Sequence, residues 1–397
     1  MLYKRLVNTL ETRRLPARAR DAMRADRSPP ADDPGVETAV TAAIAWLTRA
    51  QDSSASADGG VARHYSVVDG WAPSYPETTG YVVPTLLDYA QRSGSSALRE
   101  RARRMLDWLV SIQFPEGGFQ GGVIGATPCV PVTFNTGQIL LGLAAGTSEF
   151  GDRYRDAMRR AASWLARTQD ADGCWRQHRT PFASPSDKAY ETHVSWGLLE
   201  AARVDASEEF ASAAKRNVRW ALTNQHDNGW FENNCLTEPQ HPLTHTIGYV
   251  LRGVVEAYRY FGDEEFLAAS LRTADGVLGA LRDDGFLPGR LDRQWRGTVR
   301  WACLTGTVQI AHCWLLLYRA TGNSRYRDAA FAANAFVRRT IAVTGDGNLQ
   351  GGVRGSWPID GDYGRFEYLN WAAKFFIDAN LLEEEVRTAT PRRGPAR

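Results

Sequence analysis

The sequence contains little cysteine, and the spread of its cysteines excludes two kinds of architecture. There are five cysteines in 397 residues, an odd number, and none forms a CxxC pair. A disulfide framework and a zinc ribbon are therefore not expected. Long apolar runs are also missing, because no stretch approaches the roughly 18 apolar residues that a membrane-spanning helix requires. These absences predict a soluble globular protein in a reducing compartment, with no transmembrane segment.

A strong excess of charge of one sign is absent as well. The formal net charge is +2 at pH 7, and the excess basic residues lie towards the two ends of the chain rather than along one helical face. Nucleic acid is therefore not expected as a partner. Residues 1–27 are basic but contain no apolar core or small-residue cleavage site, so they do not read as a secretory signal. We expect a cytoplasmic protein, and the sequence does not indicate its oligomeric state.

One helical unit is repeated six times along the chain. Four segments place Ala, Leu or Met at helical spacing and end on Trp and then Gln: 36–51, 98–113, 154–169 and 210–225. Segments 266–281 and 326–341 repeat this frame in weaker form. Because these segments are amphipathic and rich in Arg on one side, we predict outer helices that face water.

Six segments of different composition alternate with the outer helices. They are apolar on more than one side, as expected of helices inside a ring, and they span 77–91, 135–145, 191–202, 244–260, 305–320 and 370–382. Successive pairs are offset by roughly 55 to 60 residues, close to the length of a helical hairpin with its loops. We therefore predict an all-α fold, a single-domain (α/α)6 toroid of six helical hairpins. An open solenoid would show the same local pattern but would need polar end repeats.

The ends of the chain are expected to lie outside this ring. The toroid should span residues 36–385, after a basic N-terminal segment with a Pro/Asp-rich linker at 1–35. Residues 386–397 are predicted to be a disordered tail. Residues 1–10 could form a short amphipathic helix that packs on the ring or touches a membrane surface.

The connections from outer to inner helix carry a QxxxGxW/F motif. It occurs at 113–119, 169–175 and 225–231, with weaker forms around Gly285 and Gly59. The glycine supplies a positive φ that ends the helix, and the aromatic residue can pack beneath the turn. With this motif the chain resembles α/α toroids of the squalene-cyclase and protein-prenyltransferase type over nearly its whole length. The resemblance implies the fold rather than the function, because the motif is mostly structural in those proteins.

The starts of the inner helices are the predicted functional region. In a toroid these starts converge on a central funnel although they are far apart in sequence. Histidine and tyrosine can transfer protons, and carboxylates can do the same when buried; the alternative for each residue is a helix cap or a packing role. The catalytic candidates are Glu77, Tyr81, Glu191, His193, His245 and Tyr249. The substrate-binding candidates are Arg63, His64, Tyr75, Asn135, Tyr190, Glu232, Asn233, His241, Arg252, Arg290, Trp295, Asp360, Tyr363, Asn370 and Trp371.

Neither a metal nor another cofactor is expected. Cys303, His312 and Cys313 share one predicted helix, but His312 and Cys313 are neighbours separated by about 100° around it. Both cannot readily face one zinc ion together with Cys303, and the spacings differ from those of prenyltransferase and lanthionine-cyclase zinc sites. The sequence also lacks a Gly-rich phosphate loop, a nucleophile elbow and a dinucleotide-binding fingerprint.

A second resemblance concerns the substrate. The stretches 229–233, 243–249 and 252–253 are similar to the corresponding part of the toroid of glucuronyl C5-epimerases. The whole chain is similar to uncharacterised toroid proteins associated with bacterial exopolysaccharide synthesis. Both relatives imply sugar chemistry, and tryptophans near the helix starts could stack on a pyranose ring.

The leading hypothesis is therefore an enzyme that acts on a uronate within a polysaccharide or sugar conjugate. A Tyr or His would take or return the proton at C5, leading to epimerisation or β-elimination. Arg63, Arg252 or Arg290, together with Asn135, would neutralise the carboxylate. Hydrolysis by Glu77 and Glu191 is a variant of this hypothesis.

Two other functions stay open at this point. The first is an isoprenoid cyclase with Asp360 and Asp362 as the acid, since Asp360-Gly-Asp362 is the segment nearest to an acidic DxDD cluster. The second is a toroid without catalytic activity that binds a glycan or a partner protein.

Overall fold

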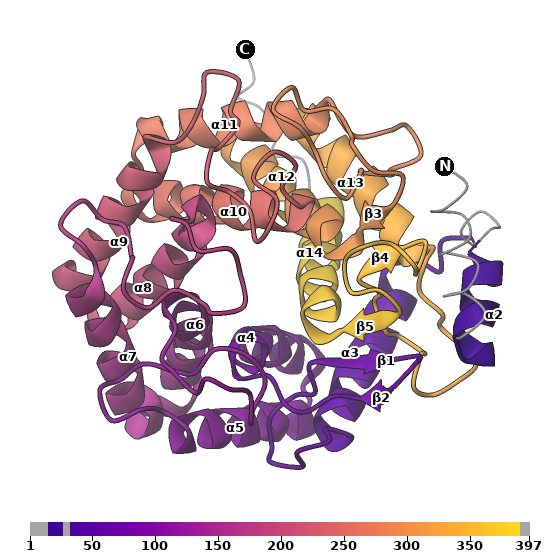
Figure 1. The fold of residues 1–397 in the computed structure, drawn as a ribbon, viewed down its shortest axis with the longest axis horizontal. Helices are drawn as coiled ribbons and strands as arrows, with labels where there is room; N and C mark the ends of the chain where they lie inside the picture. The colour runs from indigo at the N-terminus through magenta and orange to yellow at the C-terminus, as the bar shows by residue number, and fades with distance from the viewer. Residues whose placement is uncertain (1–14, 27–31, 390–397) are drawn as a thin grey trace.

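A closed ring of helical hairpins forms the body of the protein. The computed structural model describes residues 15–26 and 32–389. In these residues, helices α3 to α14 form six consecutive hairpins around a common axis (Figure 1). The predicted single-domain (α/α)6 toroid is confirmed.

The outer helices begin and end close to the repeats found in the sequence. They are α3 (Val36–Asp52), α5 (Ser96–Ser111), α7 (Arg155–Thr168), α9 (Glu208–Leu222), α11 (Glu264–Leu278) and α13 (Ser324–Arg338), with a short 3-10 turn, η1 (Gly151–Tyr154), before α7. Each buries one apolar stripe. In α7 this stripe includes Met158, Trp164 and Leu165, while Arg159 on the opposite side stays exposed. The helical spacing of the apolar residues thus fixes which side of each outer helix faces inward.

The inner helices pack side by side and close the ring. They are α4 (Pro76–Ser93), α6 (Thr133–Phe150), α8 (Thr192–Asp205, preceded by the 3-10 turn η2, Ala189–Glu191), α10 (Thr244–Phe261), α12 (Leu304–Thr321) and α14 (Asn370–Thr388). Each inner helix contacts the next, and α14 returns to contact both α4 and α3. Glycine permits the closest approaches, because a Cβ atom at Gly142 would lie 2.3 Å from the carbonyl oxygen of Gly80. The expected closure of the ring is therefore observed.

The glutamine of the QxxxGxW/F motif joins successive repeats. Gln113 donates to the carbonyl oxygen of Gly117 in its own turn and to that of Ala157 in the next outer helix, at 2.9 and 3.0 Å. Gly117 has a φ of +111° and lies so close to α7 that a Cβ atom would meet the carbonyl oxygen of Arg160 at 2.3 Å. The motif therefore holds the ring together through one side-chain amide and one glycine per turn.

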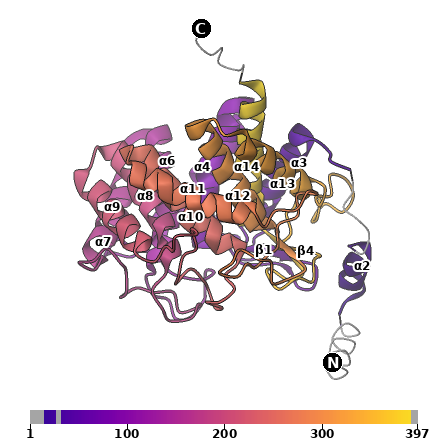
Figure 2. The same ribbon diagram turned by 90° about the horizontal axis from the view of Figure 1, so that it is seen from above.

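Short strands and long loops gather at one face of the ring (Figure 2). Strands β1 (His64–Ser66), β2 (Gly70–Trp71) and β5 (Glu367–Leu369) form an antiparallel sheet in the order β2-β1-β5, and β3 (Ala302–Cys303) pairs with β4 (Ser356–Trp357). His64 lies opposite Leu369 in the β1–β5 register. This pairing joins the first hairpin to the last at the face where the inner helices begin.

The described parts of the two chain ends contain more helix than the sequence suggested. Helix α2 (Ala17–Ala25) lies beside the ring, where Asp26 accepts hydrogen bonds from Arg354 and from the backbone of Ile359. Helix α14 continues through residues 386–388, where a tail was expected. The helix predicted for residues 1–10 lies outside the described residues, as do residues 28–31 of the linker and 390–397 of the tail. In the described part of the chain, no helix combines the length and apolar character needed to span a bilayer.

Candidate active site

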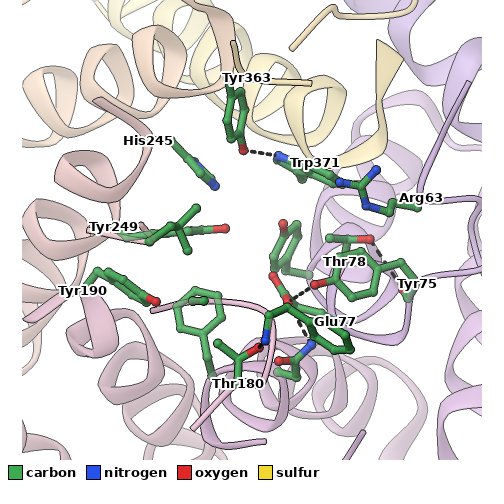
Figure 3. Close-up of a pocket in the computed structure, with 16 residues that line it drawn as sticks. Arg63, Tyr75, Glu77, Thr78, Thr180, Tyr190, His245, Tyr249, Tyr363 and Trp371 are labelled. Atoms are coloured by element: carbon green, nitrogen blue, oxygen red, sulfur yellow. Dashed lines mark hydrogen bonds between the residues drawn. The ribbon is translucent and has the colours of Figure 1, made fainter. Parts of the chain in front are cut away.

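The starts of the inner helices and the loops above them enclose a cavity of about 240 Å³ (Figure 3). Ten of the predicted site residues line it: Arg63, Tyr75, Glu77, Tyr81, Asn135, Tyr190, His245, Tyr249, Tyr363 and Trp371. They come from five of the six hairpins. They converge because every inner helix begins at the same face of the ring. We call this space the central cavity.

Glu77 is the only carboxylic acid among the described residues that line the central cavity. It is the second residue of α4, and its Oε2 accepts hydrogen bonds from the Tyr75 hydroxyl at 2.7 Å and the Asn135 amide at 2.9 Å. Burial raises the pKa of Glu77 to about 7, although the Tyr75 bond and the charge of Arg63 act in the opposite direction. Because both donors occupy Oε2, a proton on this acid is expected on Oε1. Glu77 can therefore donate or accept a proton near neutral pH.

His245 lies on another side of the central cavity, and its ring points towards the centre (Figure 3). It is the second residue of α10, and its Nδ1 lies 2.7 Å from Oε1 of Gln309. Burial lowers the pKa of His245 to about 4, so the ring is neutral at pH 7. Since Oε1 of an amide can only accept, Nδ1 carries the proton and the lone pair lies on Nε2. No described residue provides a hydrogen bond to Nε2, which leaves it available to a ligand.

Arg63 supplies the positive charge of the central cavity. Strand pairing places it beside α14, where its guanidinium lies over the Trp371 ring at 5.2 Å. Its Nη1 donates to Oε2 of Glu367 at 3.1 Å and to Nδ1 of His64 at 2.6 Å. Burial, with a smaller effect from Arg63, lowers the pKa of His64 to about 3. His64 is therefore neutral, acts as an acceptor behind Arg63 and forms no ion pair with Glu367.

Tyrosine hydroxyls occupy much of the remaining wall. Burial raises the pKa of Tyr75, Tyr81, Tyr190, Tyr249 and Tyr363 well above the usual range, so all five keep their protons. The hydroxyls of Tyr190 and Tyr249 point towards the centre, and that of Tyr363 accepts a hydrogen bond from the Trp371 indole at 2.8 Å (Figure 3). The buried Tyr81 hydroxyl interacts with that of Tyr249. The wall therefore offers hydrogen-bond donors and aromatic faces, a combination suited to a polyhydroxylated ligand.

Two catalytic candidates are placed beside the central cavity rather than in its wall. His193 lies beneath Tyr249, with a ring separation of 4.5 Å, and its Nδ1 is 2.6 Å from Gln138. Glu191 is buried next to Tyr190, and burial raises its pKa to about 8. Neither side chain belongs to the described lining of the central cavity.

Five binding candidates are absent from the described lining of the central cavity: His241, Arg252, Arg290, Asp360 and Asn370. Arg252 pairs with Glu256 at 2.8 Å and lies over Trp196, which directs it away from the lining. Arg290 donates to the carbonyl oxygen of His241 at 2.8 Å and so joins two loops outside the lining. Asp360 is exposed, and Asn370 donates to the backbone of Ala62 and to Thr78.

Glu232, Asn233 and Trp295 are likewise displaced, in this case to an exposed network behind the loops. Glu232 accepts from His226 at 2.8 Å, and Asn233 donates to Asn224 at 2.9 Å. The Trp295 ring packs against Trp230 with centroids 5.3 Å apart. These three residues were expected near the funnel, but none belongs to the described lining. Glu232 and Asn233 bond within their own turn, and Trp295 joins this turn to the next.

Six lining residues were not among the predicted site residues. Thr78 and Phe134 adjoin predicted ones at the starts of α4 and α6, so their positions carried the same signal. The other four are in the loops before η2 and α10: Thr180, Phe182, Ala183 and Leu236. These loops show no periodicity, so the sequence offered no signal for them.

The zinc candidates are also placed by the structure. Cys303 and Cys313 are buried, and burial raises the pKa of both thiols to about 12. Among the residues that the structure describes, no cluster of three or more His, Cys, Asp or Glu side chains has an arrangement that could bind a metal ion.

Comparisons with known proteins agree with this architecture. The family described as the squalene-hopene cyclase C-terminal domain matches residues 73–256, somewhat under half of the chain. The resemblance to α/α toroids is confirmed. No curated protein matches the sequence.

Solved structures similar to this chain include three carbohydrate-active proteins. An unsaturated glucuronyl hydrolase specific for heparin is 16% identical, with a TM-score of 0.71 over 89% of this chain and 97% of its own. A sugar epimerase from a ruminal bacterium is 14% identical, with a TM-score of 0.72 over 89% and 98%. The cellobiose 2-epimerase of Bacillus thermoamylovorans B4167 is 11% identical, with a TM-score of 0.67 over 85% and 95%. At these identities the likeness shows the fold alone.

Proposed function

We propose that this protein is a carbohydrate-active enzyme that transfers a proton at C5 of a uronate held in the central cavity. The observation that carries the proposal is that one cavity contains both a group able to give a proton and a group able to take one. Glu77 has a pKa of about 7 and holds a proton for much of the time at neutral pH, whereas His245 is neutral with a free lone pair on Nε2. They project into the same cavity from different inner helices (Figure 3). Acid and base on different sides of one sugar ring are what C5 epimerisation requires.

The remaining wall residues suit this reaction. A C5 proton is acidic only if the neighbouring carboxylate is neutralised as charge develops on it. Arg63 is the cation of the lining, and Tyr249 directs a hydroxyl towards the centre. A bound carboxylate would also raise the pKa of His245, because a negative charge nearby favours the imidazolium. Substrate binding would thus strengthen the base.

In the proposed reaction, Nε2 of His245 removes the C5 proton and the electron pair of the C–H bond passes into the carboxylate as an enolate. If Glu77 then returns a proton to C5 from the opposite face, the product is the C5 epimer. If the C4–O bond breaks instead and Glu77 protonates the departing oxygen, the product is a chain end with a C4–C5 double bond. Either outcome leaves His245 protonated and Glu77 ionised until solvent resets them.

The similar solved structures support sugar chemistry without fixing the reaction, because they include both hydrolases and epimerases. Hydrolysis by paired carboxylates is less well supported by the geometry. It needs two acids flanking the same bond, and the second candidate, Glu191, is absent from the described lining.

The aromatic wall favours one other class of ligand, an isoprenoid whose carbocations would be stabilised by the rings. The acid required for that reaction is not in place, since the side chain of Asp362 is 81% exposed and Asp360 is exposed as well. A carboxyl group with a pKa near 7, such as Glu77, is a poor acid for an alkene. The uronate proposal is therefore preferred.

The proposal is tested by incubating uronate-containing oligosaccharides with the protein in D2O and following the sugar by proton NMR. Epimerisation predicts that the H5 signal is lost as deuterium enters at an inverted C5. β-Elimination predicts that H5 is lost without deuterium at C5, and that an H4 signal of an unsaturated chain end appears. New reducing ends that keep H5 and lack an unsaturated chain end would identify a hydrolase. Tight binding with no chemical change would instead identify a glycan-binding toroid.

A further inference from the structure

Phe182 is the most exposed large apolar side chain in the described parts of the chain. It is 53% exposed, and the only other large apolar residue described as exposed, Val130, is 37% exposed. Phe182 also belongs to the lining of the central cavity, together with its neighbours Thr180 and Ala183. A half-exposed aromatic ring at the mouth of a cavity loses favourable burial unless a ligand covers it.

The loop that carries Phe182 is held at both sides. The backbone of Thr133, at the start of α6, donates to the carbonyl oxygen of His178 at 2.9 Å, and Ser184 donates to that of Leu236 at 2.9 Å. The backbone of Phe182 itself donates to the hydroxyl of Thr180 at 3.3 Å. The ring is therefore presented on a braced loop between α6 and the loop before α10.

A pair of glycines forms the seat of the ring. A Cβ atom at Gly122 would lie 2.8 Å from Cε2 of Phe182, and one at Gly121 would lie 3.7 Å from it. Gly122 also has a φ of +77°, which side chains rarely adopt. Part of the ring thus rests against the 121–122 backbone, and the rest is open at the cavity mouth.

The size of the central cavity indicates what passes this mouth. At about 240 Å³ it is smaller than the roughly 300–1,000 Å³ typical of sites that enclose a whole drug-sized ligand. It has room for the reacting sugar but not for a chain. The next unit of an oligosaccharide must leave across the rim, where an aromatic ring can cover the C–H face of a pyranose.

We infer that Phe182 forms a subsite at the cavity mouth that stacks on the sugar unit next to the reacting one, so that the substrate is an oligosaccharide or polysaccharide rather than a monosaccharide. This inference rests on the proposed function, because it assumes that the reacting unit occupies the central cavity.

The experiment compares glucuronic acid with heparin-derived disaccharides and tetrasaccharides, using calorimetry and the D2O exchange assay. Phe182→Ala should weaken binding of the disaccharide and tetrasaccharide by about 3- to 10-fold, the range expected for loss of one stacking contact. It should leave binding of glucuronic acid unchanged. Phe182→Tyr should restore oligosaccharide binding, and Val130→Ala, which removes the other exposed apolar side chain from outside the lining, should have no effect.

Three outcomes would contradict the inference. An equal loss for glucuronic acid and the tetrasaccharide would place Phe182 at the reacting unit, and an unchanged tetrasaccharide affinity would remove the subsite. If Phe182→Ala reduces association with anionic lipid vesicles and leaves saccharide binding intact, the ring serves a membrane surface and the inference is wrong. Length-dependent loss of binding with neither deuterium exchange nor an unsaturated chain end would support the subsite while refuting the proposed reaction, so the two failures are distinguishable.

Discussion

Two histidine–glutamine pairs occupy equivalent places in the ring, and only one of them meets the central cavity. His245 and His193 are each the second residue of an inner helix, and each places Nδ1 within 2.7 Å of a glutamine oxygen on a neighbouring inner helix. The ring of Tyr249 lies between them, 4.3 Å from His245 and 4.5 Å from His193.

The tyrosine divides the two histidines into different roles. Nε2 of His193 is buried and, among the described residues, has no hydrogen-bond partner, whereas the His245 ring lines the cavity and points towards its centre. Burial lowers the pKa of both rings, with nearby Arg252 adding to the effect at His193. One pair is therefore suited to chemistry and the other to packing, although their sequence patterns are alike.

The strongest test of this comparison is to remove each histidine in turn. His245→Ala should reduce the rate of C5 exchange by about 10²- to 10⁴-fold, the contribution typical of a general base. His193→Ala should retain exchange within a few-fold but lower the melting temperature, because it leaves a hole beneath Tyr249. Exchange rates and thermal denaturation of the two variants decide the matter. Loss of exchange in His193→Ala alone would reverse the assignment.

Glu77 lines the central cavity together with His245 but not with His193, so it provides a second test of the comparison. With a pKa of about 7, raised by burial, it loses its proton as the pH rises through neutrality. Catalysis that uses Glu77 as the acid should fall above pH 7, and Glu77→Gln should lose that limb together with about 10²-fold in rate. The pH dependence of exchange in both proteins provides the measurement.

The same pKa makes a prediction about stability. The folded protein holds the Glu77 proton more tightly than the unfolded chain, whose pKa is near 4.5. The contribution of Glu77 to the free energy of unfolding is therefore complete below about pH 4.5 and is lost as the pH rises through 7. The difference corresponds to a free energy on the order of 3 kcal/mol. Urea denaturation at pH 5 and pH 8 should show a smaller decline for Glu77→Gln than for the unaltered protein; equal declines would mean that Glu77 stays ionised when buried.

The two glutamines provide the next contrast. Gln309→Leu removes the acceptor that keeps the proton on Nδ1 of His245, and about tenfold in rate should be lost as the other tautomer becomes populated. Gln309→Glu should restore the acceptor and raise the pKa of His245, moving the acid limb of the profile to higher pH. Gln138→Leu, the matched change beneath His193, should lower stability by about 1–3 kcal/mol and leave the profile in place. A shifted profile in Gln138→Leu would show that the buried pair also takes part.

The fold could be predicted because the sequence repeats it. Six amphipathic segments and six apolar ones gave helices whose observed starts differ by only a few residues from the expected ones. The same pattern recurred in each repeat, and the glycine turns marked where each outer helix ends. Convergence of the helix starts then brought Glu77, Asn135 and His245 together without any local motif.

The rest of the site depended on features that periodicity does not encode. Trp295 has a φ of +62°. Its ring lies so close to Gly276 of α11 that a Cβ atom at Gly276 would be 2.2 Å from the ring. Thr180 and Phe182 reach the cavity through a long loop whose path is set by hydrogen bonds to distant backbone atoms. Whether His193 or His245 faces the cavity was decided by the direction of one tyrosine ring, which helical spacing alone cannot fix.

The smallest expected effect concerns Tyr75, the hydrogen-bond donor that lowers the pKa of Glu77. The Tyr75 hydroxyl donates to Oε2 of Glu77 at 2.7 Å and thereby lowers the pKa of that acid. Tyr75→Phe should move the basic limb of the exchange profile to higher pH, with a loss in maximal rate below about tenfold, since Asn135 still holds Oε2. Tyr363→Phe removes a hydroxyl that is bonded to Trp371 rather than to Glu77, so it should leave the basic limb where it is. If both variants shift the basic limb equally, the group that titrates is not Glu77. The acid that works with His245 would then have to be another residue.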